Sequence, residues 1–383
     1  MGQALAAPIT TKDSEDGAHA AKGLRWGCSC MQGWRLSMED AHFALGALSG
    51  DGWQETAAFG VMDGHGGKEV AMFCQHHLPL LIGRGSSSDT KAALVDAFHG
   101  IDDMLDSPPG PEESEEAGPR CGSAEWVGCT AVVCLVRRDV LVVGNAGDSR
   151  AVLSRRRRAM PLSTDHKPNL PEEKRRIEAA GGGVAEMSGI WRCLLPRNRI
   201  SPILGLAVSR AFGDKDFKGP DIVSAEPEVS VHEVDWDGDD FVILASDGIW
   251  DVISDRDAVR LVQQVLSEGG SEAKAAQALT SRALERGTAD DRTALVVRFG
   301  WCRNTSYRPP PEPVAEAAAA SAPQAEEEEE ENDPEVLAAI RAAMGLDDGD
   351  DESMEGEEEE EEAMAGDAEA PLAQASGATA AAA

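Results

Sequence analysis

The chain has 383 residues, 42% of them apolar, and a net charge of −34. That length is enough to bury a large core. The charge is uneven, because residues 305–383 hold 24 acidic residues and two arginines, a net of −22, so that residues 1–304 carry −12. This balance disfavours nucleic-acid binding, since phosphate backbones need a basic face. The absence of any run of 18 apolar residues disfavours a transmembrane segment.

The N-terminal residues predict neither a secretory signal nor a folded segment. They lack a basic-then-apolar pattern, and residues 1–22 are small, polar and without periodicity, so we expect a flexible arm. Met1 and Gly2 fit two interpretations. They are an ordinary initiator dipeptide, or the start of an N-myristoylation signal at Gly2 in which Ala6 stands at the usual Ser or Thr position.

The eight cysteines show no CxxC pair and no metal-ligand spacing. In a chain of this size they are typical of reduced thiols in an intracellular protein, several of them core residues. We therefore expect the protein in the cytoplasm, the nucleus or both.

Residues 23–50 alternate in a manner that fits two short strands. Arg35, Glu39 and Asp40 form a compact charged cluster in this segment. A surface salt bridge is one interpretation of the cluster, and it stays open at this point.

The stretch Ala57–Met62 predicts an apolar strand that ends at Asp63 and then breaks into glycines. Gly64 and its glycine neighbours let the backbone turn tightly and come close to whatever Asp63 holds. If the strand geometry continues, Asp63 and His65 project to the same side. An Asp-Gly turn after a core strand is the plain alternative.

Apolar spacing predicts the remaining elements of the chain. Residues 106–125 are rich in Pro, Gly and Glu and indicate a mobile surface loop. The four arginines at 155–158 fit a hairpin tip, with a nuclear address or an anion patch as the alternative. The predicted helices are 68–82, 90–105, 171–180, 255–267 and 271–286, and the predicted strands are 130–136, 140–143, 151–153, 241–245 and 294–299.

Asp63, Asp148 and Asp247 each follow an apolar strand, and Asp290 precedes one. If the last strand is antiparallel to its neighbours, its start lies at the edge where they end, and the four carboxylates converge with Glu39 as a fifth. Crowded carboxylates repel one another, and a divalent cation removes that conflict. Oxygen ligands suit Mg²⁺ or Mn²⁺ rather than zinc. More than two shared carboxylates favour a two-metal site that activates water against phosphorus.

Eight ordered stretches between about residues 23 and 300 resemble the metal-dependent protein serine/threonine phosphatases of the PP2C family. They are SCMQGWRLSMEDAH, FGVMDGHGG, GCTAVV, VGNAGDSRAVL, LSTDHKP, LAVSRAFGDKDFK, LASDGIWDV and ADDRTALVV. The resemblance implies an α+β fold, in which two antiparallel sheets pack face to face and helices cover both outer faces. The expected domains are an arm at 1–22, a phosphatase domain at 23–304 and an acidic tail at 305–383.

The resemblance also implies the ligands of two Mg²⁺ or Mn²⁺ ions. Asp63 bridges both ions, Asp247 and Asp290 bind the first, and Glu39 and the carbonyl of Gly64 serve the second. A hydroxide that bridges the ions attacks the phosphorus of phosphoserine or phosphothreonine.

Further roles follow from the same resemblance. Arg35 clamps the phosphate, because its planar fork matches phosphate oxygens. His65 protonates the leaving oxygen. Asp40 and Thr130 support the ligands from behind, and Asp148 binds a weaker third ion with Asp247.

The chain departs from the family pattern at three places. Asp291 stands where the family usually has Asn, so either Asp290 or Asp291 is the ligand, and the register favours Asp290. The segment 193–205, part of a flap beside the active site, is longer than usual. Cys129 replaces the usual Ser before Thr130.

The tail predicts disorder, with poly-Glu runs at 326–331 and 357–362. A short helical island at 333–345 interrupts it and resembles a ubiquitin-interacting motif, with an apolar stripe of Val336, Ile340 and Met344. A chance Ala-rich helix, or one that docks on the catalytic domain, is the alternative.

Two functions are compatible with these features. The first is an active phosphatase acting on phosphorylated proteins, and the second is a catalytically silent PP2C-like scaffold that binds partners, among them ubiquitin, through fold and tail. The first is preferred, because Arg35 and the metal acids are all present.

Overall fold

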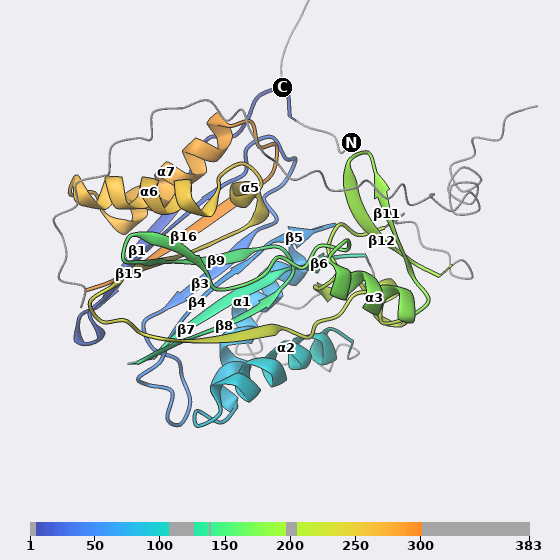
Figure 1. Ribbon diagram of the computed structural model, residues 1–383, viewed down its shortest axis with the longest axis horizontal. Coiled ribbons are helices and arrows are strands. Elements are labelled where there is room, and N and C mark those ends of the chain that lie inside the picture. Colours follow the sequence, from blue (N-terminus) through green and yellow to red (C-terminus); the bar gives the residue numbers. More distant parts are fainter. Residues whose placement is uncertain (1–4, 107–125, 138, 197–204, 301–383) are drawn as a thin grey trace, which may run out of the picture. The chain divides into compact units, whose positions relative to one another are not determined.

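The computed structural model describes residues 5–106, 126–137, 139–196 and 205–300 (Figure 1). Contacts within the chain divide it into two units, Met1–Pro311 and Glu312–Ala383, and every described residue belongs to the first. The predictions for Gly2, for most of the loop at 106–125 and for the tail with its island at 333–345 lie outside the described residues.

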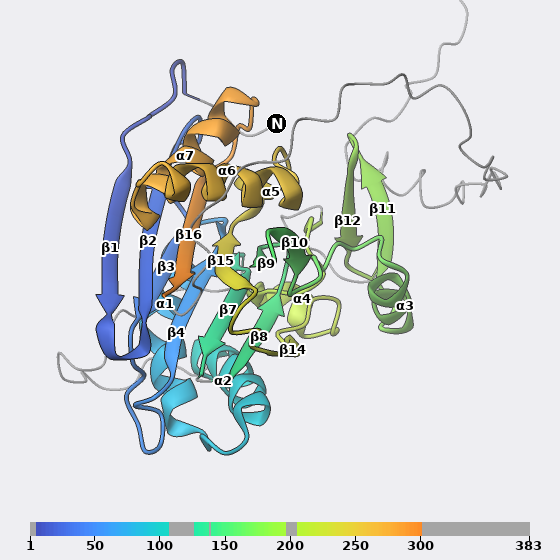
Figure 2. The same ribbon diagram turned by 60° about the vertical axis from the view of Figure 1, so that its left-hand side comes forward.

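Two antiparallel sheets form the centre of the fold (Figures 1 and 2). The six-stranded sheet has the order β1 (Asp13–His19), β2 (Leu24–Met31), β16 (Arg292–Phe299), β15 (Asp239–Ala245), β9 (Arg150–Arg155) and β10 (Arg158–Pro161). The five-stranded sheet has the order β14 (Glu228–Glu233), β8 (Val140–Ala146), β7 (Ala131–Val136), β4 (Ala57–Met62) and β3 (Ala41–Leu45).

Side chains from both sheets fill the space between them. Phe59 and Val61 of β4 and Leu244 of β15 belong to this buried cluster. The alternate residues of β4, such as Ala58 and Met62, face the opposite way, into a second cluster. Because both faces of β4 are covered, its sequence is apolar throughout instead of alternating.

Helices cover the outer face of each sheet, as Figure 2 shows. α1 (Glu69–Arg84) and α2 (Thr90–Asp106) pack on the five-stranded sheet, and α6 (Asp255–Ser267) and α7 (Glu272–Glu285) pack on the six-stranded one. Ser254 and Ser271 begin α6 and α7, since each side-chain oxygen accepts a hydrogen bond from a backbone N–H in the first turn. The α+β sandwich flanked by helices is therefore confirmed.

The predicted flexible arm at 1–22 is wrong for Asp13–His19, which form β1 at the sheet edge. β1 pairs with β2 along its whole length, from Asp13 opposite Cys30 to His19 opposite Leu24. Its side chains are mostly exposed, so no apolar alternation marks the strand in the sequence. Backbone hydrogen bonding to β2 holds it in place.

The smaller elements lie around one end of the sandwich or connect its parts. β9 and β10 form the hairpin predicted at 155–158, with Arg156 and Arg157 in the left-handed region at its tip. No helix in the described ranges has the length and apolar character needed to cross a bilayer. The remaining elements are η1 (Ala20–Lys22), β5 (Gly64–His65), β6 (Gly128–Cys129), α3 (Pro171–Ala179), β11 (Gly183–Met187), β12 (Ile190–Leu194), β13 (Phe212–Gly213), α4 (Lys215–Lys218) and α5 (Asp247–Trp250).

Candidate active site

Carboxylates from separate strands meet at one edge of the sandwich. Asp63 follows β4, Asp148 follows β8 and Asp247 follows β15. One carboxylate oxygen from each of the three lies within 4.8 Å of the others. β16 runs antiparallel to β15, with Ala294 opposite Ala245, so Asp290 lies at the same edge. The predicted convergence of the four acids is thus present in the fold.

A pocket of about 690 Å³ opens over these acids. Arg35, His65 and Thr130 share its wall with the four carboxylates, and Gly64 contributes backbone. Of the other predicted site residues, Glu39, Asp40 and Asp291 are not part of the pocket lining. The rest of the described lining is Gly66, Trp126, Lys167, Asn169, Gly189, Ile190, Trp191, Arg192, Gly205, Leu206, Ala207, Val208 and Asp251.

The acids cannot all stay ionised in this arrangement without a cation. Burial, followed by the charges of Asp40, Asp290 and Asp148, raises the pKa of Asp63 well above its usual range. Burial and the charges of Asp63 and Asp148 do the same for the pKa of Asp247. Buried oxygen ligands in mutual repulsion fit a hard divalent cation, so the residues present suit the metal ions that the resemblance implies.

Arg35 pairs with a distant acid rather than with its neighbours in sequence. Its Nη2 donates to Asp290 Oδ2 at 2.5 Å. The open interpretation of an isolated surface salt bridge among Arg35, Glu39 and Asp40 is therefore not supported. The guanidinium lies in the pocket wall beside the acids, where it can meet an anionic substrate group.

Asp290 and Asp291 have different surroundings. Asp290 lines the pocket. The Asp291 side chain is buried and accepts a hydrogen bond from the Glu39 backbone N–H at 2.7 Å. Burial is the main cause that raises the pKa of Asp291 to about 7. The arrangement favours Asp290 as the ligand, and gives Asp291 the task of fixing the Glu39 backbone.

The glycine after Asp63 allows a close approach between two backbone segments. A Cβ added at Gly64 would lie 2.4 Å from the carbonyl oxygen of Glu39, far inside any real contact. Gly66 has a φ of 72°, a region that L side chains rarely adopt. These positions explain why the acid is followed by glycines, and they bring Glu39 beside the pocket.

Asp214 is a site residue that the sequence reasoning missed. Its fully buried carboxylate accepts from, or shares a proton with, His65 Nε2 at 2.8 Å. Burial disfavours the charged imidazolium, but Asp214 outweighs it, so the pKa of His65 is raised. The strand before it, β13, has only two residues, so no apolar run in the sequence marks Asp214.

Lys167 is a second residue without a role in the sequence-based prediction. Its ammonium donates to Asp148 Oδ2 in an ion pair. Burial disfavours the charged ammonium, but Asp148 outweighs it and raises the pKa of Lys167. Asp148 therefore has a protein cation beside it already, unlike Asp63.

Asp40 and Thr130 form hydrogen bonds to residues at or next to Asp63 and Asp247. Asp40 Oδ2 accepts from the Ser246 hydroxyl at 2.8 Å, next to Asp247. The Thr130 N–H donates to the Asp63 carbonyl at 2.9 Å, and its hydroxyl pairs with that of Ser149 at 2.8 Å. The supporting role of the two residues stays a prediction.

The hairpin of β11 and β12 forms one wall of the pocket. Gly189, Ile190, Trp191 and Arg192 line it, and Ile190 and Trp191 keep 47% and 38% of their surface exposed. The lengthened segment 193–205 continues from this hairpin, with 197–204 outside the described residues. An apolar, exposed wall beside the acids is suited to contact a polypeptide substrate.

A family model described as protein phosphatase 2C matches residues 24–292. The chain belongs to the protein phosphatase 2C family. Probable protein phosphatase 2C 42 of Oryza sativa subsp. japonica is 35% identical over 328 residues, which cover 77% of this chain and 89% of the relative. Protein phosphatase 2C homolog 2 of Schizosaccharomyces pombe is 40% identical over 277 residues, 69% of this chain and 68% of the relative.

Solved structures agree on the fold of this PP2C protein. The crystal structure of serine-threonine phosphatase 2C from Toxoplasma gondii matches with a TM-score of 0.59 at 23% identity, and covers 77% of this chain and 98% of that one. Membership of the PP2C family makes the chain a metal-dependent protein serine/threonine phosphatase, and the silent-scaffold alternative is not favoured.

Proposed function

We propose that this PP2C phosphatase hydrolyses phosphoserine and phosphothreonine in intracellular proteins with two Mg²⁺ or Mn²⁺ ions at the sandwich edge. The observation that carries the proposal is the meeting of Asp63, Asp148 and Asp247 within 4.8 Å, with Asp290 and Arg35 in the same pocket wall. Asp63 would be the ligand that the two ions share. Asp247 and Asp290 would hold one ion with it, and Glu39 and the Gly64 carbonyl would hold the other.

When bound, the ions supply an activated water nucleophile and neutralise charge on the phosphate. The chain supplies the rest. Arg35, which donates to Asp290, would bind the phosphate oxygens with its planar fork, and Asp290 would help to hold an ion. With cations bound, Asp63 and Asp247 would stay ionised at neutral pH, because attraction would replace the repulsion that raises their pKa.

His65 holds the proton for the leaving oxygen. Asp214 occupies its Nε2, so Nδ1 is the nitrogen left to hold a proton toward the substrate. An alkoxide from serine or threonine is a poor leaving group and needs that proton more than an aryl oxide does. Lys167 balances the charge of Asp148 in their ion pair. A third ion at Asp148 and Asp247 would therefore bind more weakly than the first two.

The experiment that tests this function measures hydrolysis of a phosphothreonine peptide and of an aryl phosphate, with Mn²⁺ and with EDTA. We expect both activities to need the metal. His65→Ala lowers kcat on the peptide by about 100-fold and affects the aryl phosphate much less. Peptide hydrolysis that survives EDTA would contradict the metal assignment, and equal losses on the two substrates would contradict the role of His65.

Two sequence-based predictions are kept as part of the proposal: a phosphatase domain that ends at 304, with β1 as its first strand, and ubiquitin binding by the island at 333–345. Ubiquitin beads test the last of these. Wild-type chain is expected to be retained and Ile340→Asp to be lost. Equal behaviour of the two chains would remove the ubiquitin proposal.

A further inference from the structure

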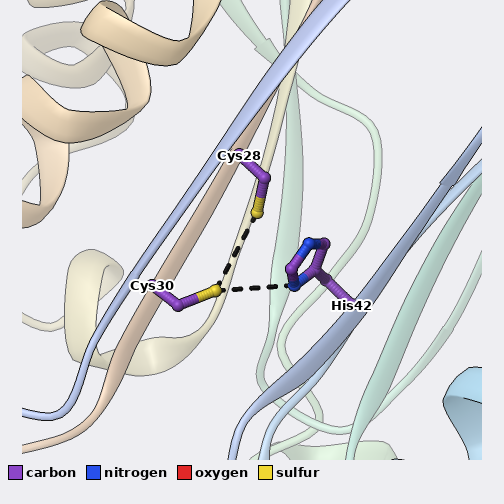
Figure 3. Close-up of side chains that lie close together, drawn as sticks. All are labelled: Cys28, Cys30 and His42. Atoms are coloured by element: carbon purple, nitrogen blue, oxygen red, sulfur yellow. Dashed lines mark hydrogen bonds between the residues drawn. The ribbon is translucent and has the colours of Figure 1, made fainter. Parts of the chain in front are cut away.

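Two thiols and an imidazole meet between the sheets (Figure 3), and none of the three residues lines the acidic pocket. Cys28 and Cys30 lie on β2 of the six-stranded sheet, and His42 lies on β3 of the five-stranded sheet. The Cys28 and Cys30 sulfurs are 4.0 Å apart, and the Cys30 sulfur is 3.5 Å from His42 Nδ1. The sequence shows no metal-ligand spacing here, because the third ligand comes from the opposite sheet.

The distances match those between ligands of a tetrahedral metal ion. Zinc bonds of about 2.3 Å to sulfur and about 2.0 Å to nitrogen place neighbouring ligand atoms roughly 3.5–3.8 Å apart. All three ligand atoms already lie within 4.8 Å of one another, so a small contraction is enough. We propose that Cys28, Cys30 and His42 form a binding site for a thiophilic cation, with Zn²⁺ as the ion, distinct from the oxygen-lined active site.

Glu15 completes the arrangement behind the histidine. Its Oε1 lies 3.1 Å from His42 Nε2, and it comes from β1, the strand next to β2. A carboxylate on Nε2 holds the ring orientation and directs the lone pair of Nδ1 toward the sulfurs, as around many zinc ions. The edge strand β1 thereby gains a role, since it carries this carboxylate.

The two thiols differ in pKa, and therefore in how readily each loses the proton that a metal ion replaces. The hydrogen bond with Cys28 is the main cause that lowers the pKa of Cys30 to about 5, and His42 adds to it against the effect of burial. The lowered pKa favours the thiolate of Cys30, the form that binds a metal ion. Burial opposes the charged form of His42, but Cys30 and Glu15 outweigh it and raise the pKa of His42 to about 10, so this imidazole also gives up a proton as the cation arrives. Burial raises the pKa of Cys28, which loses its proton as the cation arrives.

The donor set selects the class of ion. Two sulfurs and one imidazole suit zinc, whereas the carboxylates of the active site suit Mg²⁺ or Mn²⁺. Cys28 is fully buried and Cys30 and His42 are half-buried, so a fourth ligand would have to come from solvent. The chain would therefore hold two kinds of metal at two separate places.

The site would join the two sheets next to a segment that carries candidate active-site residues. β2 ends at Met31 and β3 begins at Ala41, and the segment between them carries Arg35 and Glu39. A cation that joins β2 to β3 fixes both ends of this segment. The inference does not rest on the proposed function, because it concerns residues outside the pocket.

Cobalt substitution tests the site directly. Co²⁺ is added to the full-length chain with excess Mg²⁺ and a non-thiol reductant, and the near-ultraviolet charge-transfer band of cobalt thiolate is recorded. We expect wild type and Asp63→Asn each to bind one equivalent of Co²⁺ that gives this band. Cys30→Ser and His42→Gln should each weaken Co²⁺ binding by at least about 100-fold. Cys134→Ser, a buried free thiol in the same core, should leave the band unchanged.

Thermal unfolding gives the second readout. With Mg²⁺ in excess, micromolar Zn²⁺ should raise the Tm of wild type by at least about 5 °C and leave Cys30→Ser unmoved. The absence of a cobalt thiolate band in wild type, or an equal band in the Cys28→Ser/Cys30→Ser double variant, would overturn the proposal. Loss of the band in Asp63→Asn would overturn its separation from the active site.

Discussion

Gly64 shows at the scale of one residue how the backbone, not only the side chains, shapes the site. Its missing Cβ leaves room for the Glu39 carbonyl. Asp63, Gly64 and His65 follow one another without a gap, so that the proposed shared ligand, the proposed carbonyl ligand and the proposed proton donor lie in one short segment. Gly64→Ala adds one methyl group, and it tests whether the close approach of the backbone to the Glu39 carbonyl needs glycine.

We expect Gly64→Ala to lower kcat on a phosphothreonine peptide by about 100-fold, because the clash with Glu39 moves the ligands by a sizeable part of an ångström. Gly144→Ala is the matched control. A Cβ at Gly144 meets Leu94 at an ordinary 3.5 Å, so activity should stay within about twofold of wild type. Equal activity of Gly64→Ala and wild type would contradict the close approach.

The pair of His65 and Asp214 gives a second prediction at this scale. Asp214→Asn keeps the shape of the side chain but removes the charge that favours the imidazolium. We expect about a tenfold loss of kcat on the peptide and little loss on an aryl phosphate. In a His65→Ala background the same change should cost nothing further, because the two residues act as one unit. Additive losses in this double-mutant cycle would show that Asp214 works through another group.

At the scale of elements, the sequence predicted the helices and strands whose buried residues leave an apolar pattern. The strand at 57–62 and the helix at 255–267 have the predicted bounds, because the first is buried on both faces and the second begins at the capping Ser254. β1 was missed for the opposite reason. Its side chains face solvent, and the hydrogen bonds that hold it come from β2.

α3 is attached to the core by a buried ion cluster. Arg210 Nη2 donates to Glu173 Oε1 at 2.6 Å, and Arg176 Nη2 donates to Oε2 at 3.0 Å. Burial opposes ionisation of Glu173, but the two guanidinium groups outweigh it and lower its pKa from 4.5 to about 2. A carboxylate with a lowered pKa stabilises the fold above its ordinary pKa, and that contribution is lost as the pH falls from 4.5 toward 2.

We therefore expect Glu173→Gln to lower the free energy of unfolding by about 3 kcal/mol at neutral pH. The difference from wild type should shrink by about 1 kcal/mol at about pH 3.5. Urea denaturation in EDTA measures both values without a contribution from bound metal, and the exposed Glu172→Gln serves as control. A difference that does not change with pH would contradict the role of the Glu173 charge.

At the scale of the whole molecule, the site is a product of topology. Asp63, Asp148, Asp247 and Asp290 were recognisable in the sequence because each lies at a strand end, and antiparallel pairing brings such ends to one edge. Asp214 and Lys167 were not recognisable, because the course of loops, and not strand pairing, brings them to His65 and Asp148. The Cys28, Cys30 and His42 cluster depends on packing of one sheet on the other, which residue spacing along the chain does not reveal.

The central claim is that Asp63 is shared by two metal ions that the phosphatase needs. Equilibrium binding of Mn²⁺ to wild type and to Asp63→Asn, with Glu172→Gln as a surface-acid control, tests it most directly. Weak binding by the acidic tail is common to all three chains and cancels in the comparison. The account predicts that Asp63→Asn loses both tightly bound ions that wild type and Glu172→Gln retain, and two ions bound to Asp63→Asn with unchanged affinity would contradict it.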